Sequence, residues 1–354
     1  CKSNTKVAPM FFSDHRIQAV SNLGQFLREF SQGEAISGGH EDIAEELETA
    51  IVQSHRNNGW FIEENQRHAL AAWGQALSHK ALLDWREREG GIREISRTRV
   101  GIVMAGNIPL VGLHDFLAVF LSGHFALVKR SSDDEYLIPV LVKVLLRHDP
   151  LFEGDWVFVD RLNDMEAVIA TGSDNTARYF EYYFGKYPNI IRKNRTSIAL
   201  LDGSESDEEL VALGEDIFRY FGMGCRNVGH VLVPEAFDVQ RIFANIVDWN
   251  GIVNNNKYGN NYEYYRALFL LNQDDFLENG FVIVRENEEL HTPVGIVHIS
   301  RYKAEADAAD KIAEWGEKIQ CVVGHGHIPF GKAQKPELWD YADGVNTMAF
   351  LAQL

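Results

Sequence analysis

Residues 100–129 read VGIVMAGNIPLVGLHDFLAVFLSGHFALVK, and this stretch decides the fold class. Val100 to Ala105 is a short apolar run that ends at a glycine, which is typical of a buried parallel strand. A proline at 109 suits the first turn of a helix, and residues 110–121 supply that helix. A second apolar run follows at 125–128. The stretch therefore predicts strand, helix and strand, and its polar interruptions and glycines argue against a membrane span.

The same alternation continues outward from this stretch. The residue pattern predicts helices over 133–146, 164–169 and 174–184, strands over 156–159 and 197–201, and a helical segment over residues 1–95. Alternating strands and helices indicate a parallel sheet with right-handed crossovers. Ligands bind such sheets at the carboxyl ends of the strands. Asn107, Lys129 and the pair Gly172-Ser173 fall at such ends.

The second half of the chain begins with a capping box at Ser206 to Glu209, which opens a helix. That helix leads to Cys225, and the pattern predicts further strands over 228–234, 267–271, 280–284, 295–299 and 320–323, a polar loop around 254–261 and a helix over 304–319. At 354 residues we expect two domains. We expect a nucleotide-binding domain over 1–200 with 331–354, and a catalytic domain over 201–330.

Composition restricts the classes of partner and compartment. The net charge of −17 makes a nucleic-acid-binding face improbable, because phosphate contacts require clustered lysine and arginine. The three cysteines, Cys1, Cys225 and Cys321, do not suggest a disulfide framework. No charged-then-apolar signal peptide opens the chain. We therefore expect a cytoplasmic protein without a membrane-spanning segment.

Cys225 is the candidate catalytic nucleophile. It lies between glycines and next to Arg226, whose charge would favour the reactive thiolate, while Gly222 and Gly224 permit a sharp turn. The alternative is a half-buried structural cysteine. His325 and His327 do not make a metal site without a nearby ligand set, so no metal is expected.

The runs 105–110 and 121–129 resemble those of the aldehyde dehydrogenase superfamily, and more closely those of the LuxC-type acyl-CoA reductases. The resemblance implies an aldehyde-dehydrogenase-like α/β fold, with a Rossmann-type parallel-sheet cofactor domain and an α/β catalytic domain. It also implies a role for each matching residue. Cys225 would carry the acyl group as a thioester, Asn107 would help to form the oxyanion hole, Lys129 would hold the adenosine ribose, Gly172-Ser173 would contact the phosphates, and Glu289 would contact the nicotinamide ribose.

Three departures from the superfamily pattern refine these implications. No acid occurs in 190–196, the stretch that resembles the segment carrying the water-activating glutamate of hydrolytic relatives. The usual Lys-Pro-Ser-Glu reads Lys129-Arg130-Ser131-Ser132, so no carboxylate would repel a 2′-phosphate and Arg130 could attract one. This favours NADPH over NADH. The last glycine of the Gly-Ser motif is Ala177, which leaves the pose of the pyrophosphate open.

Together these observations predict an NADPH-dependent acyl-CoA reductase that releases an aldehyde from an acyl-cysteine intermediate. The substrate would be an acyl-CoA or acyl-carrier thioester, and a homo-oligomer or an acyl-transferase partner is possible. Two alternatives stay open: an NAD(P)-dependent aldehyde dehydrogenase that forms free acid, and a non-catalytic subunit that binds acyl groups or nucleotides.

Overall fold

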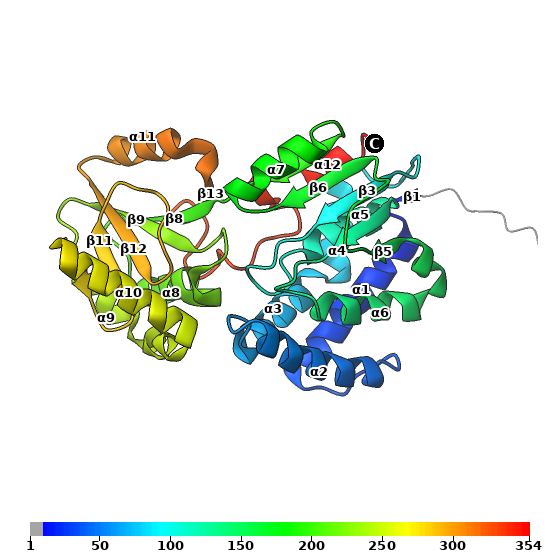
Figure 1. The fold of residues 1–354 in the computed structure, drawn as a ribbon, viewed down its shortest axis with the longest axis horizontal. Coiled ribbons are helices and arrows are strands. Elements are labelled where there is room, and N and C mark those ends of the chain that lie inside the picture. Colours follow the sequence, from blue (N-terminus) through cyan, green and yellow to red (C-terminus); the bar gives the residue numbers. More distant parts are fainter. Residues whose placement is uncertain (1–9) are drawn as a thin grey trace, which may run out of the picture. The chain divides into compact units, whose positions relative to one another are not determined.

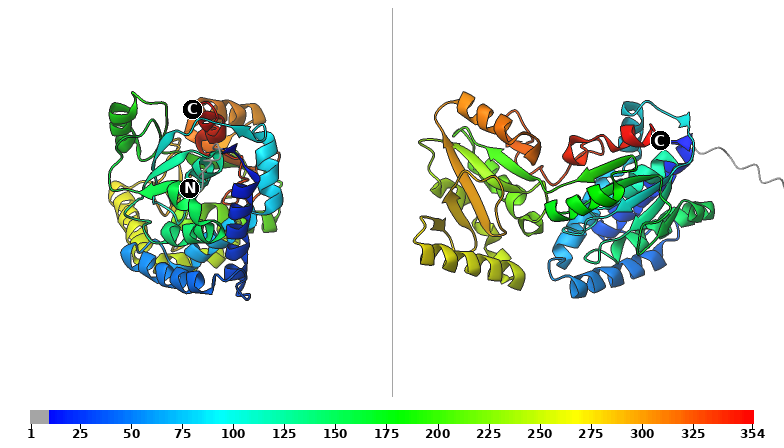
Figure 2. Two further views of the ribbon diagram at one scale, coloured as in Figure 1. Left: turned by 90° about the vertical axis from the view of Figure 1, so that its right-hand side faces the viewer. Right: turned by 45° about the horizontal axis from the view of Figure 1, so that its top comes forward.

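A computed structural model describes residues 10–354, with the backbone alone for Asp174. Cys1 therefore lies outside the described residues. The described chain divides into two compact units, residues 1–193 with 337–354 and residues 194–336. The chain thus leaves the first unit once and returns to it for its last 18 residues (Figures 1 and 2), which include the short α12, Thr347–Leu351.

The first unit is built on a five-stranded parallel sheet with the strand order β5-β4-β3-β6-β7. Its strands are β3 (Arg99–Val103), β4 (Phe125–Lys129), β5 (Trp156–Phe158), β6 (Ala167–Thr171) and β7 (Asn189–Arg192). A short antiparallel pair, β1 (Met10–Phe11) and β2 (Arg93–Glu94), stands apart from it. Helices α1 (Asp14–Gln32), α2 (Glu41–Asn57), α3 (Glu63–Ala76) and α4 (His79–Arg88) precede the sheet.

Helices connect these strands and cover the sheet. They are α5 (Leu113–Ser122), α6 (Leu137–His148) with the 3-10 turn η1 (Pro150–Gly154), and α7 (Asp174–Phe184). The returning C-terminal segment adds the 3-10 turn η5 (Ala342–Gly344). Figure 1 shows α7 on the opposite side of the sheet from α1 and α6. Phe180 and Phe184 of α7 pack against Val168 and Ala170, which are alternate residues of β6 and share one face.

The second unit is built on a six-stranded sheet with the order β10-β11-β12-β9-β8-β13, parallel except for β10. Its strands are β8 (Thr196–Leu200), β9 (Val228–Pro234), β10 (Leu277–Glu278), β11 (Ile283–Glu286), β12 (Ile296–Tyr302) and β13 (Ile319–Gly324). Its helices are α8 (Asp207–Phe218), α9 (Gln240–Asn245), α10 (Asn256–Asn272) and α11 (Glu305–Trp315), with the 3-10 turns η2 (Arg219–Gly222), η3 (Val247–Asn254) and η4 (Gly316–Lys318).

The two faces of this second sheet are covered by different helices. Val231 and Val297 face α8 and α9, whose apolar side chains include Leu213 and Ile242. Leu232, one residue along β9, points the other way and packs with Trp315 of α11. Burial of both faces explains why these parallel strands are apolar throughout rather than alternating.

The predicted α/β class and the parallel sheets are confirmed, as is the capping box, in which Ser206 and Glu209 satisfy each other's backbone N–H groups. The helix expected over 164–169 is wrong. Residues 167–171 form β6 instead, in the middle of the sheet, and Asp164 has a left-handed φ of 56° that does not fit a helix.

The strand expected over 267–271 and the polar loop around 254–261 are also wrong, because both lie largely in helix α10. Asn255 caps this helix by accepting hydrogen bonds from the N–H groups of Lys257 and Tyr258. Tyr258, Tyr262 and Phe269 are its buried residues and have helical spacing. An asparagine run that looks like a loop in the sequence thus begins a helix.

Candidate functional site

In the first unit, three of the predicted site segments follow the carboxyl ends of adjacent strands. Val103 at the end of β3 pairs with Lys129 of β4 on one side and with Ala170 of β6 on the other. The segments that carry Asn107, Lys129 and Gly172 therefore leave the same edge of the sheet. The chain runs outward from β3 to β4 and β5, and then returns to β6 and β7 on the other side. Such a change of direction leaves a crevice that suits a ligand.

The segment after β4 presents cations and hydroxyls at this edge. The Arg130 guanidinium donates to the carbonyl of Glu135 at 2.6 Å and stacks over the ring of Phe158 at 5.1 Å. Ser131 packs against Gly106, where a Cβ would meet its Oγ at 2.3 Å. Ser132 is exposed. Arg130 is thus held in place, and a planar guanidinium retains other N–H donors for a phosphate.

The turn that carries Asn107 is held by a buried carboxyl group. Asp134 is 3% exposed, and its Oδ2 accepts the backbone N–H of Leu110 at 2.8 Å. Leu110 has a left-handed φ of 60°, which is uncommon for a leucine. Burial raises the pKa of Asp134 to about 7. Asn107 itself is exposed.

The segment after β6 forms an open helix N-terminus. Ser173 caps α7, its Oγ accepting the N–H of Thr176 at 3.3 Å. A Cβ at Gly172 would meet the ring of Phe180 at 2.9 Å and Thr176 at 3.0 Å, so only glycine fits there. The backbone N–H groups of a helix N-terminus suit a phosphate group.

In the second unit, Cys225 follows a strained turn at the end of α8. Tyr220, Phe221 and Gly222 have consecutive left-handed φ values of 55°, 61° and 73°. For the two aromatic residues this conformation costs about 1–2 kcal/mol each. Their side chains are only 6% and 4% exposed, so packing maintains the strain. Tertiary packing thus overrides the local backbone preference of the turn that leads to Cys225.

Asn227 organises this turn with a single buried side chain. Its Oδ1 accepts the N–H of Gly224 at 2.8 Å, and its Nδ2 donates to the carbonyls of Asp216 at 3.0 Å and Arg219 at 2.9 Å. The hydroxyl of Ser197 in β8 donates to the carbonyl of Cys225 at 3.0 Å. The backbone on both sides of the thiol is therefore fixed, while Cys225 is only half-buried.

Arg226 makes a hydrogen bond to a distant part of the chain that could not be predicted from the sequence. Its Nε donates to the carbonyl of Ala333 at 2.6 Å. The same segment is bound by Asp216, whose carboxylate accepts the N–H groups of Gly331 at 2.6 Å and Ala333 at 2.9 Å. Burial raises the pKa of Asp216 to about 6. Arg226 thus ties the cysteine loop to residues 331–333.

Glu289 lies in an irregular loop between β11 and β12, next to the cysteine loop. Its backbone carbonyl is turned inward to two histidines of the sheet, while the residue itself is exposed. Three residues later, the hydroxyl of Thr292 would lie 2.7 Å from a Cβ on Gly229, at the start of β9. The two loops that carry Cys225 and Glu289 therefore meet at the same end of β9.

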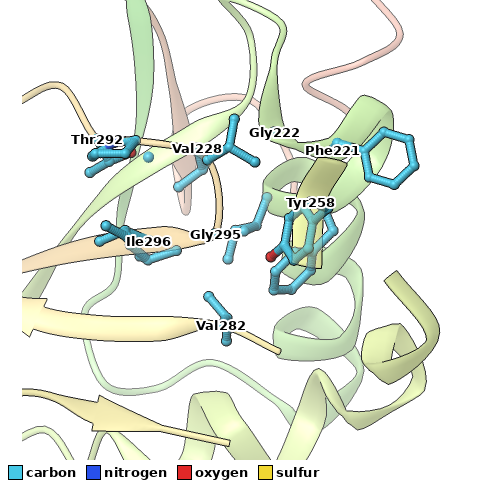
Figure 3. A pocket seen from close by; sticks show the side chains of 14 residues that line it. Phe221, Gly222, Val228, Tyr258, Val282, Thr292, Gly295 and Ile296 are labelled. Atoms are coloured by element: carbon cyan, nitrogen blue, oxygen red, sulfur yellow. The ribbon is translucent and has the colours of Figure 1, made fainter. Parts of the chain in front are cut away.

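A small pocket lies beside these loops, and most of the residues that line it are apolar. Gly222 and Val228 come from the cysteine side, and Thr292 and Pro293 from the Glu289 side. In Figure 3 the ring of Tyr258 lies beside Gly295, where it closes the pocket together with Val282 and Ile296. The Tyr258 hydroxyl donates to the carbonyl of Phe281 at 2.9 Å, which fixes the ring.

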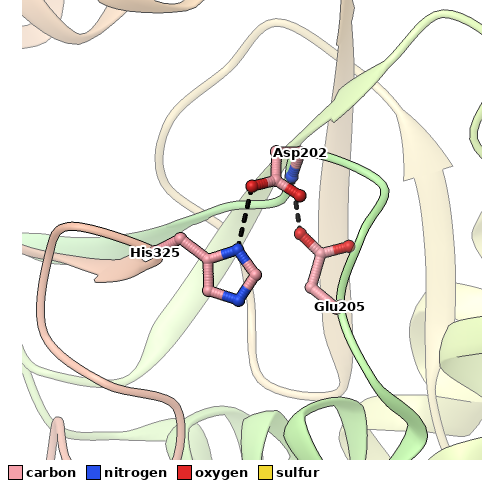
Figure 4. A group of neighbouring side chains, drawn as sticks. All are labelled: Asp202, Glu205 and His325. Atoms are coloured by element: carbon pink, nitrogen blue, oxygen red, sulfur yellow. Dashed lines mark hydrogen bonds and ion pairs between the residues drawn. The ribbon is translucent and has the colours of Figure 1, made fainter.

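Asp202, Glu205 and His325 form a separate cluster whose ligand atoms lie within 4.8 Å of one another (Figure 4). Such a set could hold a metal, but both ring nitrogens of His325 are already engaged by carboxylates. His325 contacts Asp202 through Nδ1 at 2.8 Å and Glu209 through Nε2 at 3.0 Å. The carboxylates of Asp202 and Glu209 raise the pKa of His325 to about 9. The arrangement is an imidazolium held between two carboxylates, assembled from segments too far apart to be recognised in sequence.

Within residues 10–354, none of the helices combines the length and apolar character that crossing a membrane requires. Cys225 and Cys321 are both thiols, and the Sγ of Cys321 lies 3.0 Å from the hydroxyl of Ser197. Sequence reasoning missed Ser197, Asp216 and Asn227. Asn227 lies two residues after the cysteine, where a buried amide is the usual means of holding a turn. Ser197 and Asp216 bond backbone atoms that are distant in sequence, and such contacts have no local sequence pattern.

Comparison with known proteins identifies relatives of this arrangement. The model of the acyl-CoA reductase (LuxC) family matches residues 49–242, a range that includes Asn107, Lys129, Gly172 and Cys225 but not Glu289. No curated protein matches the chain.

Solved aldehyde dehydrogenases share the fold. Aldehyde dehydrogenase 21 from Physcomitrella patens, solved with the reaction product succinate, has a TM-score of 0.60 at 12% identity, over 88% of this chain and 78% of that one. The glyceraldehyde-3-phosphate dehydrogenase GapN from Methanocaldococcus jannaschii, complexed with NADP, has a TM-score of 0.58 at 12% identity, over 87% and 79%. An NAD-dependent aldehyde dehydrogenase from Sinorhizobium meliloti has a TM-score of 0.58 at 10% identity, over 87% and 70%.

The predicted aldehyde-dehydrogenase-like fold is therefore confirmed. The family model covers more than half of the sequence, and this chain belongs to the acyl-CoA reductase (LuxC) family.

Proposed function

We propose that this protein reduces acyl-CoA or acyl-carrier thioesters to aldehydes with NADPH, through an acyl group carried on Cys225. Membership in the family supports an oxidoreductase of the aldehyde dehydrogenase and LuxC type, with a nicotinamide cofactor. The single observation that carries the finer proposal is the fixed, strained turn that ends at a half-buried thiol. We assign cofactor binding to the first unit and the covalent chemistry to the second.

In the first half of the reaction, the Cys225 thiolate attacks the thioester carbonyl. A new carbon–sulfur bond forms, and the bond to the carrier thiol breaks as that thiol leaves and takes up a proton. The bonds from Asn227 to Gly224 and from Ser197 to the Cys225 carbonyl support a preorganised nucleophile, because they fix its backbone before substrate binds. The cytoplasm, as a reducing compartment, would keep the sulfur as a thiol.

In the second half, the acyl-Cys225 thioester accepts a hydride and its carbonyl oxygen becomes an oxyanion. NADPH, when bound, would supply that hydride and be oxidised to NADP⁺. We assign the stabilisation of the oxyanion to the side-chain amide of Asn107 and the backbone N–H of Cys225, since fixed donors are needed where charge develops. As the carbon–sulfur bond breaks, the aldehyde is released and the cysteine thiolate is restored.

The residues at the edge of the first sheet fit a dinucleotide. Lys129, Arg130 and the hydroxyls of Ser131 and Ser132 would hold the adenosine ribose and its substituents, and the capped N-terminus of α7 after Gly172-Ser173 would hold the phosphates. This donor set is cationic and neutral, without a carboxylate in 129–132. It therefore favours a 2′-phosphate, and NADPH over NADH.

Two features favour transfer to a thiol carrier over hydrolysis to free acid. The stretch 190–196 lacks an acid. Arg192 from this stretch is buried and pairs with Asp115 at 2.5 Å, and it also donates to Thr347 at 2.9 Å. A cation held in this way cannot act as a general base toward water, so an acyl-enzyme would survive long enough to be reduced.

The apolar pocket beside the cysteine loop suits a hydrocarbon chain. Its walls include Phe218, Phe221 and Val282, and apolar surface that leaves water on binding contributes about 25 cal/mol per Å². We therefore assign these residues to contact with the acyl chain next to its thioester group.

The test is intact-mass and peptide mass spectrometry of the protein after incubation with a panel of acyl-CoAs without NADPH. We expect one acyl adduct on Cys225, absent from Cys225→Ala and retained in Cys321→Ala, the matched thiol control. NADPH added afterwards should remove the adduct and release aldehyde. Formation of free acid from aldehyde and NADP⁺ without CoA would instead indicate a hydrolytic aldehyde dehydrogenase. An unreactive Cys225 would indicate a non-catalytic binding subunit.

A further inference from the structure

Two buried histidines converge on one backbone atom of the loop that carries Glu289. The carbonyl oxygen of Glu289 lies 3.0 Å from Nδ1 of His230 and 2.7 Å from Nδ1 of His298. A carbonyl oxygen only accepts hydrogen bonds, so both rings must carry a proton on Nδ1. The two residues are directly paired across the neighbouring strands β9 and β12. The sheet thus presents a two-donor clamp to a single acceptor.

The rings are neutral and held in one orientation. Burial lowers the pKa of His230 to about 4 and lowers that of His298. With its Nδ1 protonated, neutral His230 has a bare Nε2, which lies 2.9 Å from the Ser300 hydroxyl and can accept from it. Trp315 packs across the His230 ring with a centroid separation of 4.7 Å. These contacts fix the tautomer and the plane of the ring.

The clamp acts on a loop with little other order. Residues 287–295 join β11 to β12 without regular secondary structure. Asn287 Oδ1 accepts the Glu289 N–H at 2.8 Å. The neighbouring residues are anchored by an ion pair between Glu288 and Lys311 and by burial of Leu290. The backbone of Glu289 is therefore bonded at both its N–H and its carbonyl, and its side chain is left at the surface.

Two histidines are an unusual choice for this position. His230 and His298 are 0% and 3% exposed, on a sheet face whose neighbours are Leu232, Ile198 and Trp315. Burying polar rings in such surroundings is unfavourable unless their hydrogen bonds are made. The chain makes those bonds to the loop, rather than filling the space with apolar side chains.

We propose that His230 and His298 are positioning residues for the cofactor: they hold the main chain of Glu289 so that its carboxylate reaches the nicotinamide ribose. This rests on the role assigned to Glu289 under the proposed function. The histidines themselves touch neither cofactor nor substrate in this proposal, and act only through the Glu289 backbone.

The test compares His298→Leu, which removes the donor, with His298→Asn, whose side-chain amide can place an N–H where Nδ1 lies. The affinity for NADPH is measured by its fluorescence, and the affinity for adenosine 2′,5′-bisphosphate, which lacks the nicotinamide half, by calorimetry. We expect His298→Leu to weaken the affinity for NADPH about tenfold, which corresponds to the loss of one buried hydrogen bond. The affinity for the bisphosphate should stay within about twofold of the wild-type value. His298→Asn should recover most of the loss.

A double-variant cycle with Glu289→Ala tests whether the histidine acts through Glu289. The effect of His298→Leu on NADPH affinity should largely vanish when Glu289 is already alanine. Additive effects, or equal weakening of both ligands, would overturn the inference, as would NADPH affinity unchanged by Glu289→Ala.

Acylation of Cys225 by acyl-CoA without NADPH is measured on the same proteins. It should persist in His298→Leu, which shows that the second unit is folded. Acylation absent from the wild-type protein itself would refute the proposed function, whatever the histidine variants do to NADPH affinity. The two failures are therefore distinguishable.

Discussion

The side-chain oxygen of Asn227 accepts a hydrogen bond from the backbone N–H of Gly224 at 2.8 Å. This bond spans Cys225, because Gly224 immediately precedes the cysteine and Asn227 follows it by two residues. The other end of the Asn227 amide donates to carbonyls at the end of α8. The turn around Cys225 is therefore braced from inside by a buried side chain that is 3% exposed.

Asn227→Ala should slow the acylation of Cys225 and destabilise the fold. It leaves a buried N–H and two carbonyls without their partner, which costs about 1–3 kcal/mol for each group left unsatisfied. Stopped-flow acylation and thermal unfolding measure the two effects. Asn250→Ala, whose exposed side chain bonds only the Val247 carbonyl at 2.8 Å, is the matched control. Equal acylation rates in the two variants would show that the brace is unnecessary.

Gly222→Ala should destabilise the protein by roughly 1 kcal/mol and reduce acylation, since a left-handed alanine is strained. The φ of Gly222 is 73°, and a Cβ there would lie 3.2 Å from the carbonyl of Ile217. Gly251 has no such constraint, with open space around a Cβ, so Gly251→Ala should leave both quantities unchanged. Urea unfolding checks the stability, and identical midpoints for the two alanine variants would contradict the argument.

Much of the fold could be predicted from local pattern, because buried parallel strands and capped helices leave short signatures. Residues 100–129 and the Ser206 box are examples. The sequence indicates a strand end at 170–171, but the first part of β6 was assigned to a helix, because the polar residues before a short apolar run resemble a helix start. Pairing with β3 and β7 decides in favour of the strand. Helix α10 was missed because asparagines favour both loops and helix caps. In each case tertiary contacts decided between local alternatives.

The candidate site divides in the same way. Cys225 stood out from its own neighbouring residues, whereas Asn107, Lys129 and Gly172 were singled out by their places after predicted strands and by the resemblance to the aldehyde dehydrogenase superfamily. Ser197, Asp216 and the two histidines of the clamp act on backbone atoms many residues away, and such bonds have no sequence signature. Arg226 is adjacent to the thiol in sequence, but its hydrogen bond from Nε to the Ala333 carbonyl, 107 residues away, could not be predicted from that adjacency.

Asp134→Asn should change how stability depends on pH. The pKa of Asp134 is raised from 3.8 to about 7, so the folded protein keeps a proton that the unfolded chain loses. The stabilisation that the protonated Asp134 carboxyl contributes to the folded state is fully present below about pH 4 and is lost as the pH rises through about 7. Asparagine keeps an acceptor for the Leu110 N–H but does not titrate. The stability of the variant relative to wild type should therefore rise between about pH 4 and 7. Urea unfolding across this range tests it, and a constant difference would contradict it.

Ser132→Glu should shift the cofactor preference toward NADH. Ser132 is exposed beside Arg130, and a carboxylate there would repel a 2′-phosphate but accept the 2′-hydroxyl of NADH. We expect KM for NADPH to rise at least about tenfold, with a smaller change or a fall for NADH. Ser132→Gln, similar in size but uncharged, separates charge from bulk. Equal increases in KM for NADPH and for NADH in Ser132→Glu would contradict the assignment of residues 129–132 to the 2′-phosphate.

The most direct measurement is the mass of Cys225 peptides after exposure to acyl-CoA and then to NADPH. The account predicts an acyl-sized increase on Cys225 that disappears when NADPH is added, with one equivalent of aldehyde released. A protein that oxidises NADPH with acyl-CoA while Cys225 is never acylated, or with Cys225 replaced by alanine, would contradict it.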